Sequence, residues 1–191
     1  MTAPTHASDF DTLAVEYHRF RSSYSDRLFD TIARYAGSLQ GRRALDIACG
    51  TGLSTRGLTS RGIQTTGIDI AATMLDAARQ AGLTGATFFE ARAESLPFAD
   101  GAFGLVTCGQ AFHWFEARVV LDEIERVLVR GGAHAQYWKH ALPSDPYVKA
   151  ADDLEREWLG LDSEFVWNAY ASTLRDAWTQ SRLVDREKHE F

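Results

Sequence analysis

Apolar residues along the chain follow two alternating patterns. Short continuous apolar runs, typical of strands buried on both faces of a sheet, alternate with segments that repeat an apolar residue every three or four positions, as amphipathic helices do. We expect strands at residues 43–48, 63–68, 87–90, 103–108 and 133–138. We expect helices at 53–62, 71–81 and 117–129, the last ended by Gly131-Gly132. This alternation predicts an α/β doubly wound fold with a mostly parallel sheet and right-handed crossovers.

Helical patterns also flank this alternating region. Before it we expect a helix over residues 10–20 and a second between the N-cap Ser25 and a stop at Gly37. After it, residues 147–159 and 163–178 read as two helices, and 184–191 alternate weakly like the start of a sixth strand. We therefore expect a single domain over 1–191, divided into N-terminal cap helices (1–40), a core (41–140), C-terminal helices (141–183) and the beginning of strand six (184–191).

Composition narrows the class of protein. A chain of 191 residues is long enough for one well-filled domain and short for two. A formal net charge of -6 argues against nucleic acid as the main partner. No apolar run is long enough to cross a bilayer, and the N-terminus lacks the basic start and apolar core of a signal peptide. We expect a cytoplasmic protein without a metal site, in which Cys49 and Cys108 are reduced core residues.

The candidate chemistry starts where the first strand ends, in the run from Asp46 to Gly52 (Asp-Ile-Ala-Cys-Gly-Thr-Gly). Two glycines between a strand and a helix allow a tight turn and a close approach of the backbone to a ligand, so this is a candidate nucleotide-binding loop. A second acid, Asp69, ends the next strand 17 residues after Gly52 (69 − 52), near the spacing of about 20 at which an acid binds a ribose diol.

The loop departs from the dinucleotide-binding fingerprint. The position of its third glycine is Thr55, and the carboxylate of Asp46 would repel a pyrophosphate but suits a cationic ligand. Ligands of such sheets bind at the carboxyl ends of the strands. On this reading one edge of the sheet gathers Gly50, Gly52, Asp69, Ala93, Glu94, Gln110 and His113.

The motifs along the chain are the run from Asp46 to Gly52, Asp69, Ala93-Glu94, Leu96-Pro97-Phe98 and Gly131-Gly132. Together these motifs resemble the class I S-adenosylmethionine-dependent methyltransferases, type 11. The segment 110–115 (Gln-Ala-Phe-His-Trp-Phe) resembles a small-molecule subgroup with His-Trp-Phe after strand four, and residues 17–24 are similar to its opening segment. The resemblance covers about residues 10–140. It implies a Rossmann-like sheet, a C-terminal helical lid above the methyl acceptor, and hairpin strands that this chain leaves incomplete.

The resemblance also implies S-adenosylmethionine as cofactor and assigns its contacts. Asp46 would lie near the ammonium group, directly or through water. Asp69 would accept hydrogen bonds from both ribose hydroxyls, and Ile70 would flank the adenine. Arg92 stands where many relatives have an acid, which leaves the partner of the adenine amine open. The full set of implied cofactor-binding residues is Tyr17, Arg21, Asp46, Ala48, Gly50, Gly52, Asp69, Ile70, Met74, Ala93, Glu94 and Gln110.

Catalysis and acceptor binding are assigned to the segment after strand four. His113 is the candidate general base, needed only for an acceptor that must lose a proton; alternatively it is anchored by a backbone carbonyl and shapes the loop. Phe112, His113 and Trp114 would line the acceptor pocket, or the aromatic residues simply fill the core.

Three functions stay open at this point. The first is methyl transfer to a small molecule, with a carboxylate or another oxygen nucleophile as acceptor. The second is a non-catalytic S-adenosylmethionine-binding module, and the third is a nicotinamide-dependent oxidoreductase. The incomplete hairpin would expose the edge of strand five, from which we expect a truncated sequence or pairing with another chain, such as a homodimer.

Overall fold

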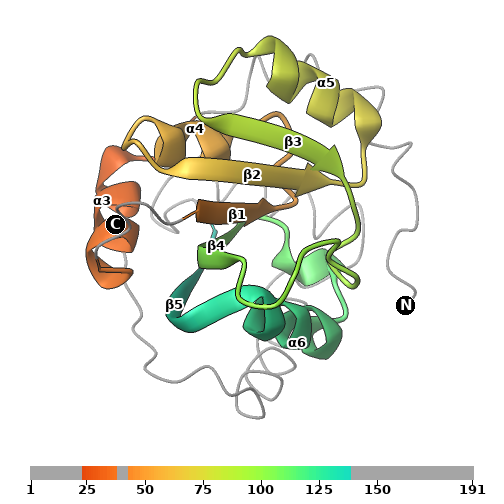
Figure 1. Cartoon of the computed structure of the whole chain (residues 1–191). Helices are drawn as coiled ribbons and strands as arrows, with labels where there is room; N and C mark the ends of the chain where they lie inside the picture. Colours follow the sequence, from red (N-terminus) through yellow and green to blue (C-terminus); the bar gives the residue numbers. More distant parts are fainter. Residues whose placement is uncertain (1–22, 38–42, 139–191) are drawn as a thin grey trace, which may run out of the picture.

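The computed structural model describes residues 23–37 and 43–138 (Figure 1). The elements in chain order are α3 (Asp26–Tyr35), β1 (Arg43–Ile47), α4 (Leu53–Thr59), β2 (Gln64–Asp69), α5 (Ala72–Gln80), β3 (Ala86–Glu90), β4 (Phe103–Gly109), the 3-10 turn η1 (Phe112–Trp114), α6 (Ala117–Val127) and β5 (Leu128–Tyr137). The expected helix over residues 10–20, the C-terminal helices, the start of strand six, Tyr17 and Arg21 lie outside the described residues.

The described strands form one sheet in the order β3-β2-β1-β4-β5, and every neighbouring pair is parallel. The predicted α/β doubly wound, Rossmann-like fold is confirmed. β1 and β4 are inner strands of this sheet. Every residue of β1 except its first is buried, and every residue of β4 except its last is buried. This explains their continuous apolar runs, because a central strand of a parallel sheet is covered on both faces.

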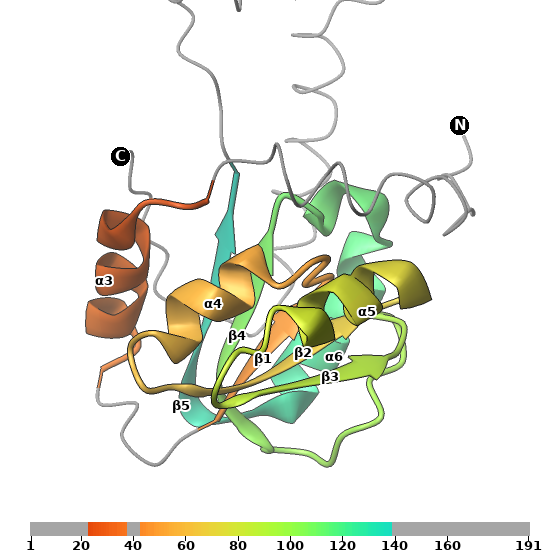
Figure 2. The ribbon, with the colours of Figure 1, turned by 90° about the horizontal axis from the view of Figure 1, so that it is seen from above.

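Helices cover both faces of the sheet. On one face, α3 and α4 pack Phe29 and Leu58 against Ala44 of β1 and Leu105 of β4. Figure 2 shows α5 on the same side of the sheet as α4. On the other face, α6 buries its apolar stripe against the alternate residues of the same strands; this core includes Leu45, Val106, Val120, Leu121 and Ile124. Strands are added on one side of β1 up to β3 and on its other side from β4 onward, and with right-handed crossovers this change places the two sets of helices on opposite faces.

The two glycines before the fifth strand correct one prediction. α6 ends at Val127 and β5 begins at Leu128, so Gly131 and Gly132 lie inside the strand and do not end the helix. The register against β4 shifts here, between the pairs Phe103–Leu128 and Leu105–Ala133. Gly131 has a φ of +73°, and a Cβ on Gly132 would lie 2.9 Å from the carbonyl oxygen of Val129. The glycines therefore form a tight irregularity in the strand.

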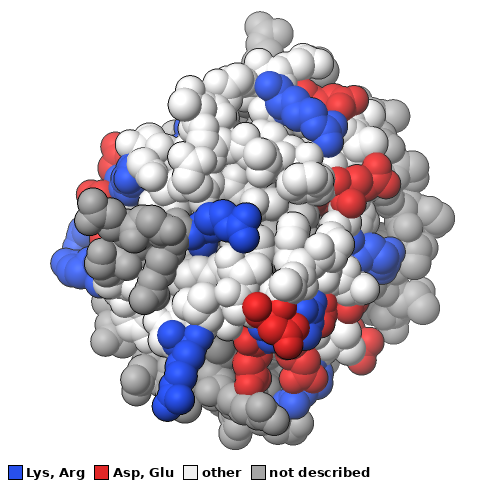
Figure 3. All heavy atoms as spheres, viewed as in Figure 1, with Lys and Arg blue, Asp and Glu red and all other residues white. Residues whose placement is uncertain are grey.

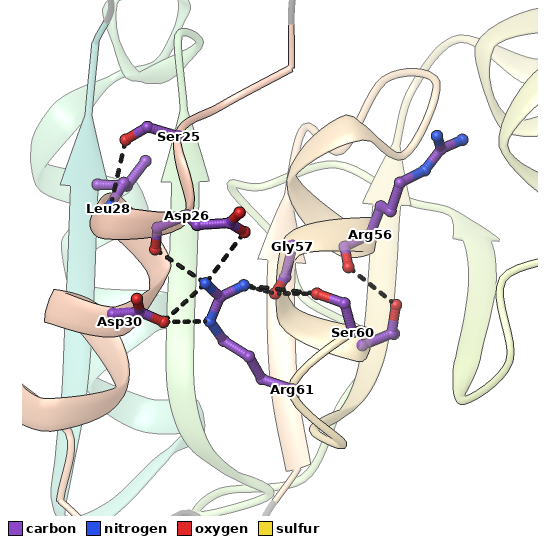
Figure 4. A network of polar contacts seen from close by, with 9 residues as sticks. Ser25, Asp26, Leu28, Asp30, Arg56, Gly57, Ser60 and Arg61 are labelled. Carbon is purple, nitrogen blue, oxygen red and sulfur yellow. Dashed lines mark hydrogen bonds and ion pairs between the residues drawn. The ribbon is translucent and has the colours of Figure 1, made fainter.

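Arg61 ties α3 to the end of α4 (Figure 4). Its guanidinium donates to the Asp26 carbonyl at 2.8 Å, to the Asp30 carboxylate at 2.9 Å and to the Gly57 carbonyl at 3.0 Å. α3 itself begins as expected, since the Ser25 hydroxyl accepts a hydrogen bond from the backbone N–H of Leu28 at 3.3 Å. These contacts hold the first described helix against the helix that follows the glycine loop.

The surface carries both signs of charge. On the face that Figure 3 shows, basic and acidic side chains lie next to one another, and other residues cover most of the rest. Within residues 23–37 and 43–138, no helix is long and apolar enough to span a membrane.

Candidate functional site

The carboxyl ends of β1, β2 and β4 bring several predicted site residues together. The register aligns Ile47 of β1 with Ile68 of β2 on one side and with Cys108 of β4 on the other, so these strands end side by side. The backbone N–H of Gly50 donates to Oδ2 of Asp69 at 2.9 Å. The first glycine of the loop and the acid of the second strand thus meet, as the sequence predicts.

Asp69 is oriented by the backbone from both sides. Besides the bond to Gly50, its Oδ1 accepts from the N–H of Ala71 at 3.0 Å. The half-buried carboxylate is therefore held in place at the strand end by the backbone of the glycine loop and of the residue that precedes α5.

Two predicted site residues have a strained backbone. Ala48 (φ +51°) and Gln110 (φ +63°) are the non-glycine residues in the left-handed region within the described part of the chain. They follow the neighbouring strands β1 and β4. A side chain in this region costs about 1–3 kcal/mol, and such strain collects at functional sites.

The two loop glycines serve different purposes. Gly50 has a φ of +53°, and a Cβ built on it would meet no atom of the described residues within 4 Å. Gly52 (φ +83°) is the N-cap of α4, and its Cβ would lie 3.4 Å from Ala78 of α5 and 3.5 Å from Phe88 of β3. Among the described residues, the loop is therefore open at Gly50, while Gly52 permits the close packing of the layers.

Thr51, between the two glycines, is a buried residue that the sequence analysis did not single out. It is 2% exposed, and its hydroxyl has no hydrogen-bond partner among the described residues. A buried hydroxyl without a partner is costly.

Asp46 lies beneath the loop and is fully buried. Its Oδ1 accepts from the hydroxyls of Ser54 (3.1 Å) and Thr107 (2.8 Å), and its Oδ2 accepts from Thr55 (2.7 Å). Burial raises the pKa of this carboxyl to about 6, although the three hydrogen bonds oppose the rise. Thr55, the residue in place of a third glycine, is thus a hydrogen-bond donor to the buried carboxylate.

Tyr137, at the end of β5, adds one more hydroxyl to the hydrogen-bonded group around Asp46. Its phenol is hydrogen-bonded to the Ser54 hydroxyl, and burial raises the pKa of the phenol. Its ring packs edge-on against Tyr24, with 5.1 Å between centroids. Both tyrosines occupy the space beside Gly109, where a Cβ would lie 2.6 Å from Tyr137 and 2.8 Å from the Tyr24 oxygen.

The residues expected around the adenine differ in exposure. Ile70 is 44% exposed and offers apolar surface, whereas Met74 and Ala93 are buried at 3% and 4% exposure. Glu94 is half-buried and pairs with Arg92 at 3.6 Å. Whether Glu94 accepts from an adenine amine stays a prediction.

Of the three residues expected to line an acceptor pocket, only two reach the surface. His113 is half-buried, its ring lies 4.8 Å from that of the exposed Trp114, and burial lowers its pKa, so the imidazole is neutral at neutral pH. Phe112 has no exposed surface and packs against Phe115 at 5.7 Å between centroids. This burial leaves the predicted contact of Phe112 with the acceptor without geometric support and matches the alternative of core filling.

Comparison with known proteins agrees with this geometry. Residues 45–135, which include most of β1, the glycine loop and most of β5, match a family model described as a methyltransferase domain. The chain belongs to the class I S-adenosylmethionine-dependent methyltransferases.

Individual relatives support the assignment to the methyltransferases. An uncharacterised methyltransferase of Mycobacterium tuberculosis is 33% identical over 129 residues, which are 68% of this chain and 51% of the relative. A demethylmenaquinone methyltransferase of Clavibacter sepedonicus is 33% identical over 152 residues, covering 76% and 62%. The crystal structure of the YcgJ protein of Bacillus subtilis superimposes with a TM-score of 0.54 and 28% identity, covering 69% and 58%. The chain spans about half the length of the first curated relatives it matches.

The sequence predicted the residues at the carboxyl edge of the sheet in this methyltransferase domain. It did not predict the polar residues buried in the glycine loop and around Asp46. Those residues are Thr51, Ser54, Thr55, Thr107 and Tyr137. One signal was available, because Ser54, Thr55 and Thr107 are polar residues at positions that the apolar pattern assigns to the interior. Their common target, Asp46, is a long-range contact that no local pattern reveals.

Proposed function

We propose that this chain binds S-adenosylmethionine and transfers its methyl group to a small-molecule acceptor. The observation that carries the proposal is the bond between Gly50 and Asp69 beside the open space at Gly50. A backbone open to close approach and an oriented acid suit the two ends of this cofactor, its amino-acid part and its ribose. The family to which the chain belongs supports the same reading.

The cofactor contacts follow from the positions at the sheet edge. Asp69 would accept from the ribose hydroxyls, Ile70 would cover one face of the adenine, and the loop around Gly50 would approach the amino-acid part. Ala48 and Gln110 would shape the loop by their strained backbone. Bound S-adenosylmethionine supplies a methyl group activated by its sulfonium, so the chain mainly has to hold an acceptor in line and exclude water.

His113 and Trp114 stand on the acceptor side of this proposal. The imidazole of His113 is neutral because burial lowers its pKa, so it is able to take a proton from an acceptor. A carboxylate acceptor is already ionised and needs no base, whereas a hydroxyl acceptor does. The effect of His113→Gln on the rate therefore separates the two kinds of oxygen nucleophile: no loss supports a carboxylate, and a loss of about a hundredfold or more supports a hydroxyl.

Calorimetry with two ligands tests the cofactor. We expect S-adenosylhomocysteine to bind and NAD not to bind. Asp69→Asn should weaken binding of the homocysteine compound about tenfold or more, because a carboxylate accepts both ribose hydroxyls better than an amide does. Asp76→Asn is the matched control, since this exposed acid of α5 pairs with Arg79 of the same helix at 2.8 Å. NAD binding without binding of S-adenosylhomocysteine would overturn the proposal in favour of an oxidoreductase.

Catalysis needs a separate measurement. A screen of small carboxylic acids, phenols and alcohols with S-adenosylmethionine should release S-adenosylhomocysteine for at least one acceptor. Binding of the cofactor with no turnover across the screen would favour a non-catalytic binding module.

Assembly and location extend the proposal. We propose a homodimer through the outer edge of β5, which pairs only with β4 among the described strands. Sedimentation equilibrium tests this, and a monomer at micromolar concentration would contradict it. The two cysteines are free thiols in the structure, which supports a reducing, cytoplasmic location.

A further inference from the structure

Three hydroxyl groups donate to the carboxylate of Asp46, and a fourth is hydrogen-bonded to one of these three. Ser54 and Thr55 come from the start of α4, Thr107 from β4 and Tyr137 from the end of β5. We call these four residues the hydroxyl cluster. The cluster and Asp46 connect the helix that follows the glycine loop to two strands on the far side of β1.

The direction of the hydrogen bonds in this cluster follows from counting protons. A serine hydroxyl has one hydrogen, and that of Ser54 is donated to Asp46. The hydroxyl of Tyr137 must therefore donate to Ser54. Three hydroxyls therefore donate to the carboxylate directly, and Tyr137 donates to it through Ser54. These hydrogen bonds stabilise the negative charge of Asp46 inside the protein.

The same geometry separates Asp46 from any ligand on the loop. Asp46 has no exposed surface, while the open space of the loop lies at Gly50. Hydroxyls of the protein take three of the about four acceptor positions of this carboxylate, two on Oδ1 and one on Oδ2. The resemblance implies that Asp46 lies near the cofactor's ammonium group, directly or through water, and a direct contact requires an oxygen that reaches this space.

We propose that Asp46 is a positioning residue, which holds the glycine loop in its binding conformation through the hydroxyl cluster and does not contact the ligand. Tyr137 is the far anchor of this arrangement. The inference rests on the proposed function and assigns a mechanism to one part of the same site.

Two kinds of variant separate charge from position. Asp46→Asn removes the charge and keeps the cluster: its Oδ1 still accepts from Ser54 and Thr107, and its NH2 faces the Thr55 oxygen, which is able to accept. Tyr137→Phe keeps the charge and removes the anchor. Ser54→Ala cuts the same connection one step nearer to Asp46 and serves as a second variant if Tyr137→Phe fails to fold.

The test is calorimetry with S-adenosylhomocysteine and with 5′-methylthioadenosine, which keeps the nucleoside and lacks the ammonium group. Asp46→Asn should bind both ligands within about threefold of the wild type. Tyr137→Phe and Ser54→Ala should weaken S-adenosylhomocysteine about threefold to tenfold, the value of one hydrogen bond. Thr65→Val is the matched control: it removes a buried hydroxyl of β2 that bonds to the Ile63 carbonyl, and it should bind as the wild type.

A second measurement needs no ligand. Amide hydrogen exchange at residues 50–55 should be faster in Tyr137→Phe than in the wild type, and unchanged in Thr65→Val. Unchanged exchange together with unchanged affinity in both cluster variants would overturn the positioning role.

The opposite result for Asp46 is equally clear. If Asp46→Asn loses S-adenosylhomocysteine binding tenfold or more and keeps binding of 5′-methylthioadenosine, the carboxylate acts on the ammonium group and the inference is wrong. Wild-type protein that binds neither compound overturns the proposed function first, and the inference with it.

Discussion

At the scale of single residues, the buried carboxylate of Asp46 is the costliest group of the site. Three hydroxyls donate to it, yet burial still raises its pKa from the ordinary value of 3.8 to about 6. The ionised form is therefore less favourable in the folded protein than in the unfolded chain. A group with a raised folded-state pKa binds more protons when folded, so its contribution to stability falls as pH rises from about 4 to 6.

Asp46→Asn should remove this contribution. Relative to the wild type, the variant should gain on the order of 2–3 kcal/mol in the free energy of unfolding between pH 4 and pH 7, because wild-type Asp46 must ionise in that window. Urea denaturation of both proteins at the two pH values measures the change. Asp122→Asn, an exposed acid paired with Arg118 at 3.0 Å, should show less than about 1 kcal/mol. A difference in the free energy of unfolding between wild type and Asp46→Asn that does not change with pH would contradict the expectation.

Asp46 also shows what a sequence reveals about a site. Its place at the end of the first strand followed from the apolar run and the glycines, which are local features. Its surroundings did not, because Thr107 and Tyr137 are 61 and 83 residues from Asp46 and Ser54, respectively. Thr55 looked like a missing glycine of a dinucleotide motif, and the structure shows it as a partner of the carboxylate.

At the scale of elements, the contact between α3 and α4 depends on a glycine. The ring of Phe29 lies against Gly57, and a Cβ built there would be 2.0 Å from the ring. Arg61 lies over the other part of the same ring, 5.4 Å from its centroid. The two helices thus approach closely because residue 57 has no side chain.

Gly57→Ala should therefore destabilise the protein, although alanine is favoured in a helix by about 1 kcal/mol. We expect a net loss of about 1–3 kcal/mol from overpacking, measured by urea denaturation. The same substitution in a Phe29→Leu background should cost less, because leucine leaves room for the methyl group. An equal cost in both backgrounds would show that the ring is not the cause.

A second contact between elements fixes the loop over residues 91–102. Arg126 of α6 donates to the carbonyls of Phe98 at 2.8 Å and Leu96 at 3.0 Å. It also pairs with Glu123 at 2.7 Å, and this hydrogen bond lowers the pKa of the Glu123 carboxyl. Glu123 in turn accepts from the backbone N–H of Leu96 at 2.6 Å. The helix thereby holds the loop that contains Ala93 and Glu94.

Arg126→Gln should release this loop. We expect a loss of about 1–3 kcal/mol in stability, since two carbonyls and the carboxylates of Glu123 and Asp100 lose a charged donor. We also expect weaker binding of S-adenosylhomocysteine. Thermal denaturation and calorimetry measure the two effects. Arg118→Gln on the same helix removes an exposed ion pair with Asp122 and should change neither. Unaltered affinity in Arg126→Gln would mean that the loop does not contribute to the site.

At the scale of the whole molecule, the alternation of strands and helices was enough to predict a parallel sheet. Continuous apolar runs identified β1 and β4, because both faces of these strands are covered. The start of β5 was placed five residues too late, at 133 and not at 128. Glycines usually end helices, and only the pairing with β4 shows that Gly131 and Gly132 belong to a strand irregularity.

The two cysteines give this molecule an internal measure of how often it opens. Cys49 follows β1 and Cys108 lies in β4, and both are buried. Burial and the nearby charge of Asp46 raise the pKa of both thiols, so neither is a reactive thiolate in the folded state. Since the chain has no other cysteine, a thiol reagent can report only on these two positions.

Their labelling by a disulfide reagent should therefore follow the opening of the structure and need no introduced probe. We expect slow reaction of both thiols in native buffer, and a further slowing by about a hundredfold with S-adenosylhomocysteine at a hundred times its Kd. Fast reaction of Cys49 alone would indicate that the glycine loop opens without the sheet. The labelling rates of these two buried thiols then distinguish opening of the loop from unfolding of the whole domain.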